Sequence, residues 1–320
     1  MTSPNEQASD IPTIAPEDKG HCRELLDPWV IRSMPTSDPE WRRILAKDLW
    51  HWRGKLWKNR LKGMVSGNMK AATRFRTADH VRKTYGRTWG KQDWPSADQP
   101  VDPARITMAE WRGEGLILKR GGLNPMQLER LMVLVASTKP RKVLEVGAGS
   151  GQNLLCLSAA FPDISFTGIE LTEEGVERAR SVQEHEHLPD VIKRYSPYPI
   201  ADDTAHRKVN FRQGDATDLP FEDGSFDLVY SRLALEQMER VRKKAVAEMV
   251  RVSSEYVLMI EPFANFNDDK HRRLAHKAKN FFSMRLEELP GAGLEPLAVF
   301  SDWPQKISEG VGLVYCRKTG

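Results

Sequence analysis

Apolar segments in the second half of the chain have the lengths of buried strands and are separated by helical segments. The apolar runs lie at about 142–147, 165–170, 208–212, 226–231 and 255–261. Short apolar runs that alternate with helices predict a parallel sheet with helices on both faces. A helix predicted from Asn124 to about Ser137 precedes the first strand, and its apolar residues would cover the sheet.

The end of the chain has a different pattern. Leu294 to Phe300 and Val311 to Arg317 read as two strands with no helix between them, only Trp303-Pro304 and Gly310. Two strands joined in this way predict an antiparallel pair at one edge of the sheet. The expected fold class is therefore α/β, with a seven-stranded, mostly parallel sheet that ends in an antiparallel pair.

The first 122 residues divide into a tail and an extension. Residues 1–20 are rich in Ser, Pro, Asp and Glu, and we expect a disordered tail. Residues 21–122 read as a basic, Trp-rich helical extension and a connector, with helix from about 38 to 86 and the connector at 92–122. Two apolar strips follow the predicted helix, one containing Trp41, Leu45, Leu49, Trp52 and Leu56, and the other containing Trp50, Trp57 and Leu61.

Composition limits the class of protein. Apolar residues make up 40% of the 320, enough for a core, and no apolar run approaches the ~20 residues that cross a bilayer. Cys22, Cys156 and Cys316 are few and widely spaced, which favours a reducing compartment and argues against a zinc site. The N-terminus lacks the layout of a signal peptide, so we expect a cytoplasmic protein without a bound metal.

A glycine-rich loop follows the first predicted strand of the sheet. Glu145 lies near the end of that strand, and glycines follow at 147, 149 and 151. Glycine allows a ligand to approach the backbone closely. The dinucleotide fingerprint would place its third glycine at Gln152, and Glu145 would repel a pyrophosphate but suits a ligand with an ammonium group.

The next two strands also end in acids. Glu170 closes the second strand, 21 residues after Gly149, where an acid can bind a ribose diol. Gly214-Asp215 closes the third strand. The glycine-rich loop, Glu170 and Gly214-Asp215, in this order and spacing, resemble the motifs of the class I S-adenosylmethionine-dependent methyltransferases. The resemblance covers about residues 125–317.

The resemblance implies a methyltransferase domain at 123–320 that binds S-adenosylmethionine. It implies that the glycines face the methionine moiety, that Glu170 binds the ribose hydroxyls, and that Asp215 with the Ala216 amide recognises adenine. The expected cofactor-binding residues are Glu145, Gly147, Ala148, Gly149, Gly151, Asn153, Glu170, Leu171, Gly214, Asp215, Ala216 and Ser231. The alternatives are a Rossmann-like domain for another nucleotide and a methyltransferase-like domain without activity.

Methyl transfer from a sulfonium depends largely on alignment and needs a general base only when the acceptor is protonated. Ligands of open α/β sheets bind beyond the carboxyl ends of the strands. This rule selects Glu236 as the candidate acid–base and Glu261 as a candidate acceptor-binding group. The alternative for Glu236 is a helix cap or an ion pair with Arg232. The insertion at 181–208 contains His185-Glu186-His187. At alternate positions on a helix the two imidazoles would point in different directions, so we interpret the insertion as a surface loop or a mobile loop over the substrate and not as a metal site.

Charge is concentrated in one segment. Residues 41–91 contain 15 Lys and Arg against two acids and therefore carry a net charge of +13. The net charge of the whole chain is +4, so the remaining residues carry −9. Four interpretations are a packed helical cap, a lid for an anionic acceptor, a helix on an anionic membrane and an RNA contact. The chain lacks the signature of nucleobase amino methylation after the fourth strand.

These observations together predict transfer to an oxygen or nitrogen of a small, possibly anionic molecule. A lipid at a membrane surface and RNA are alternative acceptors. A noncatalytic S-adenosylmethionine-binding or scaffold protein is the alternative from another class.

Overall fold

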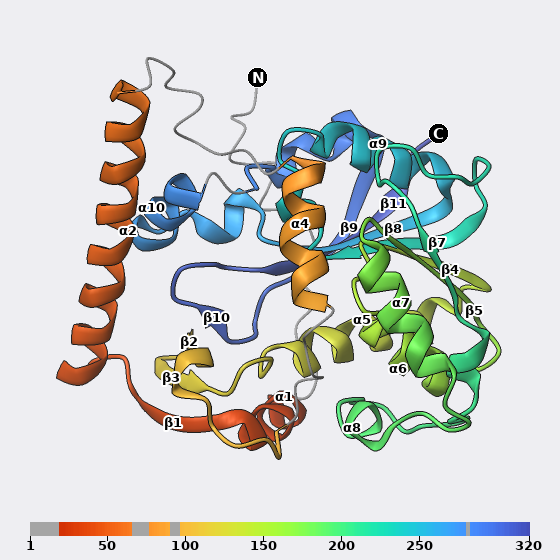
Figure 1. Ribbon diagram of the computed structural model, residues 1–320, viewed down its shortest axis with the longest axis horizontal. Helices are drawn as coiled ribbons and strands as arrows, with labels where there is room; N and C mark the ends of the chain where they lie inside the picture. Colours follow the sequence, from red (N-terminus) through yellow and green to blue (C-terminus); the bar gives the residue numbers. More distant parts are fainter. Residues whose placement is uncertain (1–18, 66–76, 90–96, 280–281) are drawn as a thin grey trace.

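The computed structural model describes residues 19–65, 77–89, 97–279 and 282–320 (Figure 1). The expected disordered tail therefore lies almost wholly outside the described residues, as does part of the basic segment at 66–76. Within the described ranges, no helix is both long enough and apolar enough to cross a membrane.

A seven-stranded sheet forms the centre of the molecule. Its strands are β4 (Lys142–Val146), β5 (Ser165–Glu170), β6 (Asn210–Gln213), β7 (Phe226–Arg232), β8 (Ser253–Glu261), β9 (Leu294–Phe300) and β11 (Gly312–Lys318). They lie in the order β6-β5-β4-β7-β8-β11-β9; the first five are parallel, and β11 is antiparallel to β8 and β9. The predicted fold class is confirmed, including the antiparallel strands at the end of the chain.

Helices cover the sheet, and apolar residues are buried on both of its faces. Along β4, Val143 packs into one apolar core cluster, whereas Leu144 and Val146 pack into another. Burial on both faces explains why the strands read as continuous apolar runs. The helices of this half are α5 (Asn124–Thr138), α6 (Gln152–Ala160), α7 (Glu173–Gln183), α8 (Asp190–Lys193), α9 (Arg242–Val252) and α10 (Lys270–Lys279).

A second, antiparallel sheet lies where a connector was expected. Its strands, in the order β1-β3-β2-β10, are β1 (Val30–Pro35), β2 (Thr107–Trp111), β3 (Glu114–Leu118) and β10 (Gln305–Lys306). Arg112 and Gly113 form the two-residue turn between β2 and β3, with φ of 48° and 82°. The expectation of a connector at 92–122 was wrong for this part, because Arg-Gly is a weaker hairpin signal than Asn-Gly or Asp-Gly.

The extension is attached to the rest of the molecule through β10. This strand lies in the chain between β9 and β11 of the large sheet, yet it pairs with β2 of the small one. The described chain begins with α1 (Lys19–Leu26). It also contains short 3₁₀ helices, namely η2 (Asp27–Trp29), η3 (Pro103–Arg105), η4 (Ala205–Lys208), η5 (Leu235–Gln237), η6 (Ala264–Asn267), η7 (Leu286–Glu288) and η8 (Pro290–Ala292).

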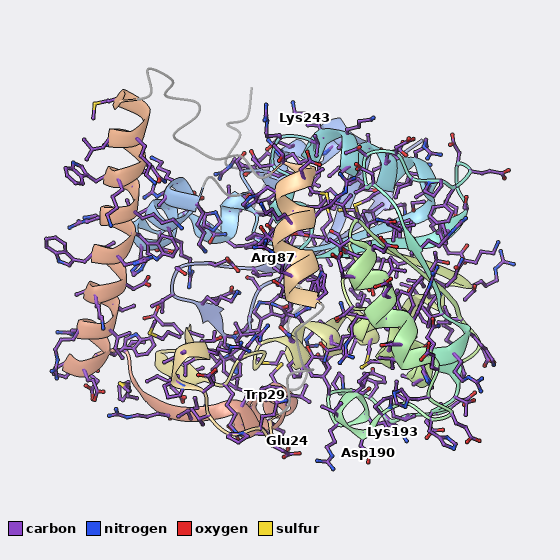
Figure 2. The ribbon with its side chains drawn as sticks, viewed as in Figure 1. Glu24, Trp29, Arg87, Asp190, Lys193 and Lys243 are labelled. Carbon is purple, nitrogen blue, oxygen red and sulfur yellow. The ribbon has the colours of Figure 1, made fainter. Side chains whose placement is uncertain are left out.

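Two long helices, α2 (Pro39–Val65) and α4 (Ala78–Trp89), agree with the predicted helical region. The first apolar strip of α2 faces the protein: Trp41 is fully buried and donates to Glu110 at 2.7 Å, and Trp52 packs on α10. The second strip faces outward, with Trp50 73% and Trp57 62% exposed. Among the elements that the structure describes, none lies beyond the outer side of α2 (Figures 1 and 2).

The insertion at 181–208 is folded against the body of the protein. His187 is hydrogen-bonded to Asp203 at 3.0 Å, and Lys193 donates to the same carboxylate. His206 is fully buried, and the ring of Tyr195 packs edge-on against Trp29. Within the part of the chain that the structure describes, no three acidic, His or Cys side chains are grouped to hold a metal ion.

Candidate active site

Two cavities meet at the glycine loop, beyond the carboxyl ends of the parallel strands. The apolar cavity has a volume of about 300 Å³ and the polar cavity one of about 440 Å³. Gly147, Leu233, Tyr85 and Trp89 line both. The apolar cavity is otherwise defined by Val81, Ile169, Glu170, Asp215, Met238 and Val241, and the polar cavity by Arg120, Asn124, Glu145, Asn153, Arg232, Glu236 and Lys306.

The glycine loop adopts a backbone conformation that favours glycine. Gly147, Gly149 and Gly151 have φ of 79°, 56° and 79°. A Cβ on Gly147 would lie 2.4 Å from the Cβ of Ala234, and one on Gly149 would lie 2.9 Å from the ring of Trp89. The first two glycines are therefore required by the walls of the cavities.

Gly151 serves the packing of the domain. It caps α6, and a Cβ there would meet Phe211 and Ala179, so this glycine lets the helix approach the sheet. It does not line either cavity. Ser231, also among the expected cofactor residues, is fully buried outside the cavity linings.

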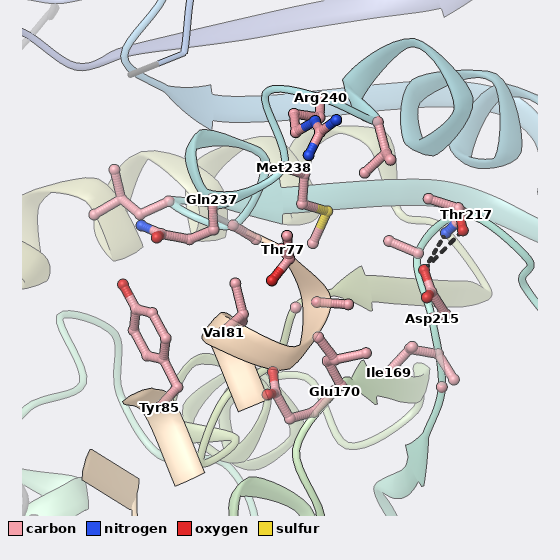
Figure 3. Close-up of a pocket in the computed structure, with 18 of the residues that line it drawn as sticks. Thr77, Val81, Tyr85, Ile169, Glu170, Asp215, Thr217, Gln237, Met238 and Arg240 are labelled. Carbon is pink, nitrogen blue, oxygen red and sulfur yellow. Dashed lines mark hydrogen bonds between the residues drawn. The ribbon is translucent and has the colours of Figure 1, made fainter. Parts of the chain in front are cut away.

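Two acids project into the apolar cavity (Figure 3). Glu170 accepts from the amide of Gly149 at 3.0 Å and from the amide and hydroxyl of Thr172 at 3.0 and 2.7 Å. Asp215 accepts from the amide and hydroxyl of Thr217, both at 2.9 Å and both through Oδ1. These bonds fix the two carboxylates at either side of the cavity and leave lone pairs for a ligand's hydroxyl or amino groups.

Glu145 is buried beside the polar cavity. Burial raises its pKa to about 7, and the hydrogen bond from Asn153 Nδ2, 2.7 Å long, opposes the shift. A carboxyl with a pKa near neutrality gains its charge when a cation binds next to it. Glu145 therefore suits a positively charged ligand group, as the sequence predicted.

The turn after β7 carries residues of both cavities. Leu233 has a φ of 52°, which is strained for a leucine, and its amide donates to Ile260. Glu261 holds this turn: Oε1 accepts from the amides of Ala234 and Leu235 at 3.0 Å each, and Oε2 accepts from Glu236 at 3.3 Å. The turn directs Glu236 to the polar cavity.

Glu261 does not have the position expected of an acceptor-binding group. It is fully buried and lines neither cavity. Burial raises its pKa to about 7, although its bonds to the three amides favour the charged form. Sequence reasoning placed Glu261 correctly at the end of a strand, but it had no access to the direction of the side chain.

Glu236 lies in the polar cavity, where a general base was expected. Its side chain accepts from Gln237, and Arg232 donates to Gln127 at 3.0 Å and Asn124 at 2.6 Å. The structure thus brings Glu236 together with ten of the expected cofactor residues around the two joined cavities: Glu145, Gly147, Ala148, Gly149, Asn153, Glu170, Leu171, Gly214, Asp215 and Ala216.

Sequence reasoning missed the contribution of α4. Thr77 just before this helix, and Val81, Tyr85 and Trp89 on it, line the cavities. The helix lies close to α7 at Gly86. A Cβ on this glycine would lie 2.6 Å from the carboxylate of Glu174, so a larger residue would not fit there. The aromatic residues of the basic segment gave a signal, but nothing in the sequence said which strand ends they would cover.

The comparisons with known proteins agree with this fold. Residues 144–256 match the model of the methyltransferase domain family. Ajmaline N-methyltransferase of Rauvolfia serpentina is 34% identical over 116 residues, 36% of this chain and 33% of that protein. The O-methyltransferase rstn1 of Aspergillus nomiae is 30% identical over 118 residues, 37% of this chain and 44% of that protein.

A crystal structure of the YcgJ protein from Bacillus subtilis aligns over 61% of this chain and 99% of that one, with 17% identity and a TM-score of 0.44. The chain spans less than half the length of the two curated relatives above, so the similarity concerns the domain. Residues 144–256 therefore form a methyltransferase domain, and the seven-stranded sheet that contains them has the fold of the class I S-adenosylmethionine-dependent methyltransferases.

Proposed function

We propose that this protein transfers a methyl group from S-adenosylmethionine to an oxygen or nitrogen of a small molecule. The observation that carries the proposal is the pair of joined cavities at the glycine loop, one apolar with two fixed acids and one polar with a candidate base. A reaction that aligns two substrates needs two adjoining sites of this kind.

The residues present fit the donor. The apolar cavity would take the nucleoside, with Glu170 accepting from the ribose hydroxyls and Asp215 from the adenine amino group. The methionine end would pass Gly147 toward the polar cavity, where Glu145 would face the ammonium. Gly147 supports this path because it lines both cavities.

The polar cavity would hold the acceptor. Displacement at a sulfonium needs no acid for the leaving group, so the protein's main contribution would be alignment of the nucleophile. Where the acceptor is a hydroxyl or an ammonium group, a base must take its proton, and Glu236 is the group that we propose for this role. Its carboxylate lines the polar cavity.

We further propose a division of the chain into a methyltransferase domain at 123–320 and an extension at 21–122. The small sheet and α4 of the extension would complete the acceptor side, since Thr107, Arg120 and Tyr85 line the polar cavity. The extension would thus select the acceptor, while the common domain binds the donor.

Calorimetry with S-adenosylmethionine and S-adenosylhomocysteine tests the donor site. We expect binding by the wild type and a loss of at least about tenfold in Asp215→Ala, because a buried-site hydrogen bond to a ligand is removed. Asp218→Ala, which removes an exposed acid of the same loop that does not line the cavity, is the matched control. No binding by the wild type would refute the proposal.

A labelled methyl donor then tests turnover, with the products of cell extract separated into small-molecule, lipid, RNA and protein fractions. We expect label in the small-molecule fraction and its loss in Glu236→Gln. Donor binding without transfer to any fraction would favour the noncatalytic alternative. Label in RNA would favour the RNA alternative.

A lipid acceptor at an anionic membrane is the second candidate, favoured by the outer side of α2. Trp50 and Trp57 lie seven residues apart and so share one helix face, and both are largely exposed. Lys47, Arg53 and Arg60 flank them and are exposed as well. Binding to anionic but not neutral vesicles, lost in Trp50→Ala with Trp57→Ala, would support this candidate.

A further inference from the structure

Three cations line the polar cavity, and the fold brings them there from distant parts of the chain. Arg120 follows β3, Arg232 ends β7, and Lys306 lies in β10. None belongs to the basic segment at 41–91, and none of the described Lys and Arg residues of that segment lines either cavity. The positive charge at the polar cavity therefore does not come from the basic segment at 41–91.

Arg120 has no hydrogen bond or ion pair with any residue that the structure describes. Its pKa is lowered by burial and, to a smaller extent, by the like charge of Arg105, which is itself paired with Asp102 at 3.4 Å. Arg120 as a whole remains exposed to solvent, and it lines the polar cavity without a described counter-charge that an anion would have to displace.

The charge of the other two cations is also incompletely balanced. Arg232 donates to the neutral side-chain amides of Gln127 and Asn124. Lys306 shares the single carboxylate of Glu309 with Lys279, at 2.9 and 3.1 Å. One acid thus serves two lysines.

Two acids line the same cavity and oppose this charge. Glu236 is one, and Glu145 is the other, but its pKa of about 7 means that it carries only part of a charge at neutral pH. Three cations against at most two carboxylates leave the cavity positive. The ammonium and the carboxylate at the methionine end of the donor would cancel each other and leave this excess unchanged.

We propose that the acceptor carries a carboxylate or phosphate group and that Arg120 is the residue that binds it in the polar cavity. This inference rests on the proposed methyl transfer and names the class of its substrate. Arg120 is the principal contact because its planar donors match both anions and have no partner to leave among the residues of the described ranges. Arg232 and Lys306 add charge from the same cavity. A volume of about 440 Å³ accommodates a small organic molecule.

Four probes in matched pairs test the inference on the full chain: phenyl phosphate with phenol, and benzoate with benzamide. Each is titrated by calorimetry or ligand-observed NMR, with and without saturating S-adenosylhomocysteine. We expect at least one anion to bind with a dissociation constant in the millimolar range or tighter, and its neutral partner to bind at least about tenfold more weakly. The two anions distinguish a phosphate from a carboxylate.

Arg120→Gln should weaken the anion about tenfold or more, and Arg120→Lys should fall between Gln and the wild type, because it keeps the charge but loses the fork. Arg273→Gln, an exposed arginine of α10 outside both cavities, is the control and should bind the anion as the wild type does. Equal binding of anion and neutral partner, no binding of either anion, or unchanged binding in Arg120→Gln would each overturn the inference.

The affinity for S-adenosylhomocysteine separates this inference from the proposed function. If Arg120→Gln weakens S-adenosylhomocysteine, Arg120 contacts the carboxylate of the donor, and the inference is wrong. If the wild type binds no S-adenosylhomocysteine but binds an anion through Arg120, the anion site stands and the proposed function fails.

Discussion

The two cavities at the glycine loop differ in how they are built. The apolar cavity takes its acids from the ends of β5 and β6, which are neighbours in the sheet. Each acid accepts from the amide and hydroxyl of a threonine two residues later in the chain, and Glu170 also accepts from the amide of Gly149. The polar cavity takes its cations from the extension, the large sheet and β10. Under the proposed function, the donor site is therefore built from local motifs, whereas the acceptor site is built from tertiary contacts.

Gly147 is the glycine of the loop that lines both cavities, so its substitution should have the largest effect. In Gly147→Ala the new methyl group would lie 2.4 Å from Ala234, on a backbone with a φ of 79°. We expect S-adenosylhomocysteine binding to fall by about a hundredfold or more, measured by calorimetry. Gly54→Ala, on the open side of α2, should leave binding unchanged and stabilise the protein by up to about 1 kcal/mol. Equal affinities in the two variants would contradict the assignment of the loop.

Glu261 tests whether the turn after β7 serves both cavities. Glu261→Ala would leave three buried amides without their acceptor, and we expect a loss of about 2–4 kcal/mol in the free energy of unfolding, measured with denaturant. Where the variant folds, S-adenosylhomocysteine and the anionic probes should both bind more weakly, because the turn lines both cavities. Weakening of only one ligand would show that the cavities are independent there.

Trp89 covers the glycine loop from the extension. In Trp89→Ala we expect S-adenosylhomocysteine binding to weaken about tenfold, because the ring that lies against Gly149 would be lost. Thr84→Ala, on the exposed side of α4, is the control. If Trp89→Ala binds as tightly as the wild type, the extension does not contribute to the donor side.

The raised pKa of Glu145 predicts that donor binding depends on pH. Its pKa of about 7 in the free protein should fall when the donor's ammonium binds, so binding should release protons near pH 7 and tighten as pH rises through 7. Calorimetry in buffers of different ionisation enthalpy measures this release, and Glu145→Gln should abolish it. Proton uptake in the wild type would be the contrary result.

The same group contributes to stability with the opposite sign. Its folded pKa lies above the value of 4.5 expected in the unfolded chain, so its contribution is complete below pH 4.5 and is lost as pH rises through 7. Glu261, with a pKa of about 7, contributes in the same direction. Glu145→Gln should therefore lose less stability than the wild type between pH 5 and pH 8, followed by thermal unfolding without ligand.

The sequence by itself determined the large sheet and the donor side. Strand runs, helices and the spacing from Gly149 to Glu170 are local patterns, and parallel strands place their carboxyl ends at one edge of a sheet. Glu170, Asp215 and the loop therefore lie together for a reason that can be read from the chain.

Only the tertiary structure decided the acceptor side. The β2–β3 hairpin has an uncommon turn sequence, β10 is two residues long, and the side-chain direction of Glu261 depends on the turn that it holds. The same is true of Arg120, Arg232 and Lys306, which are far apart in the chain. Their meeting depends on the pairing of β10 with β2, a long-range contact for which the sequence contains no local signal.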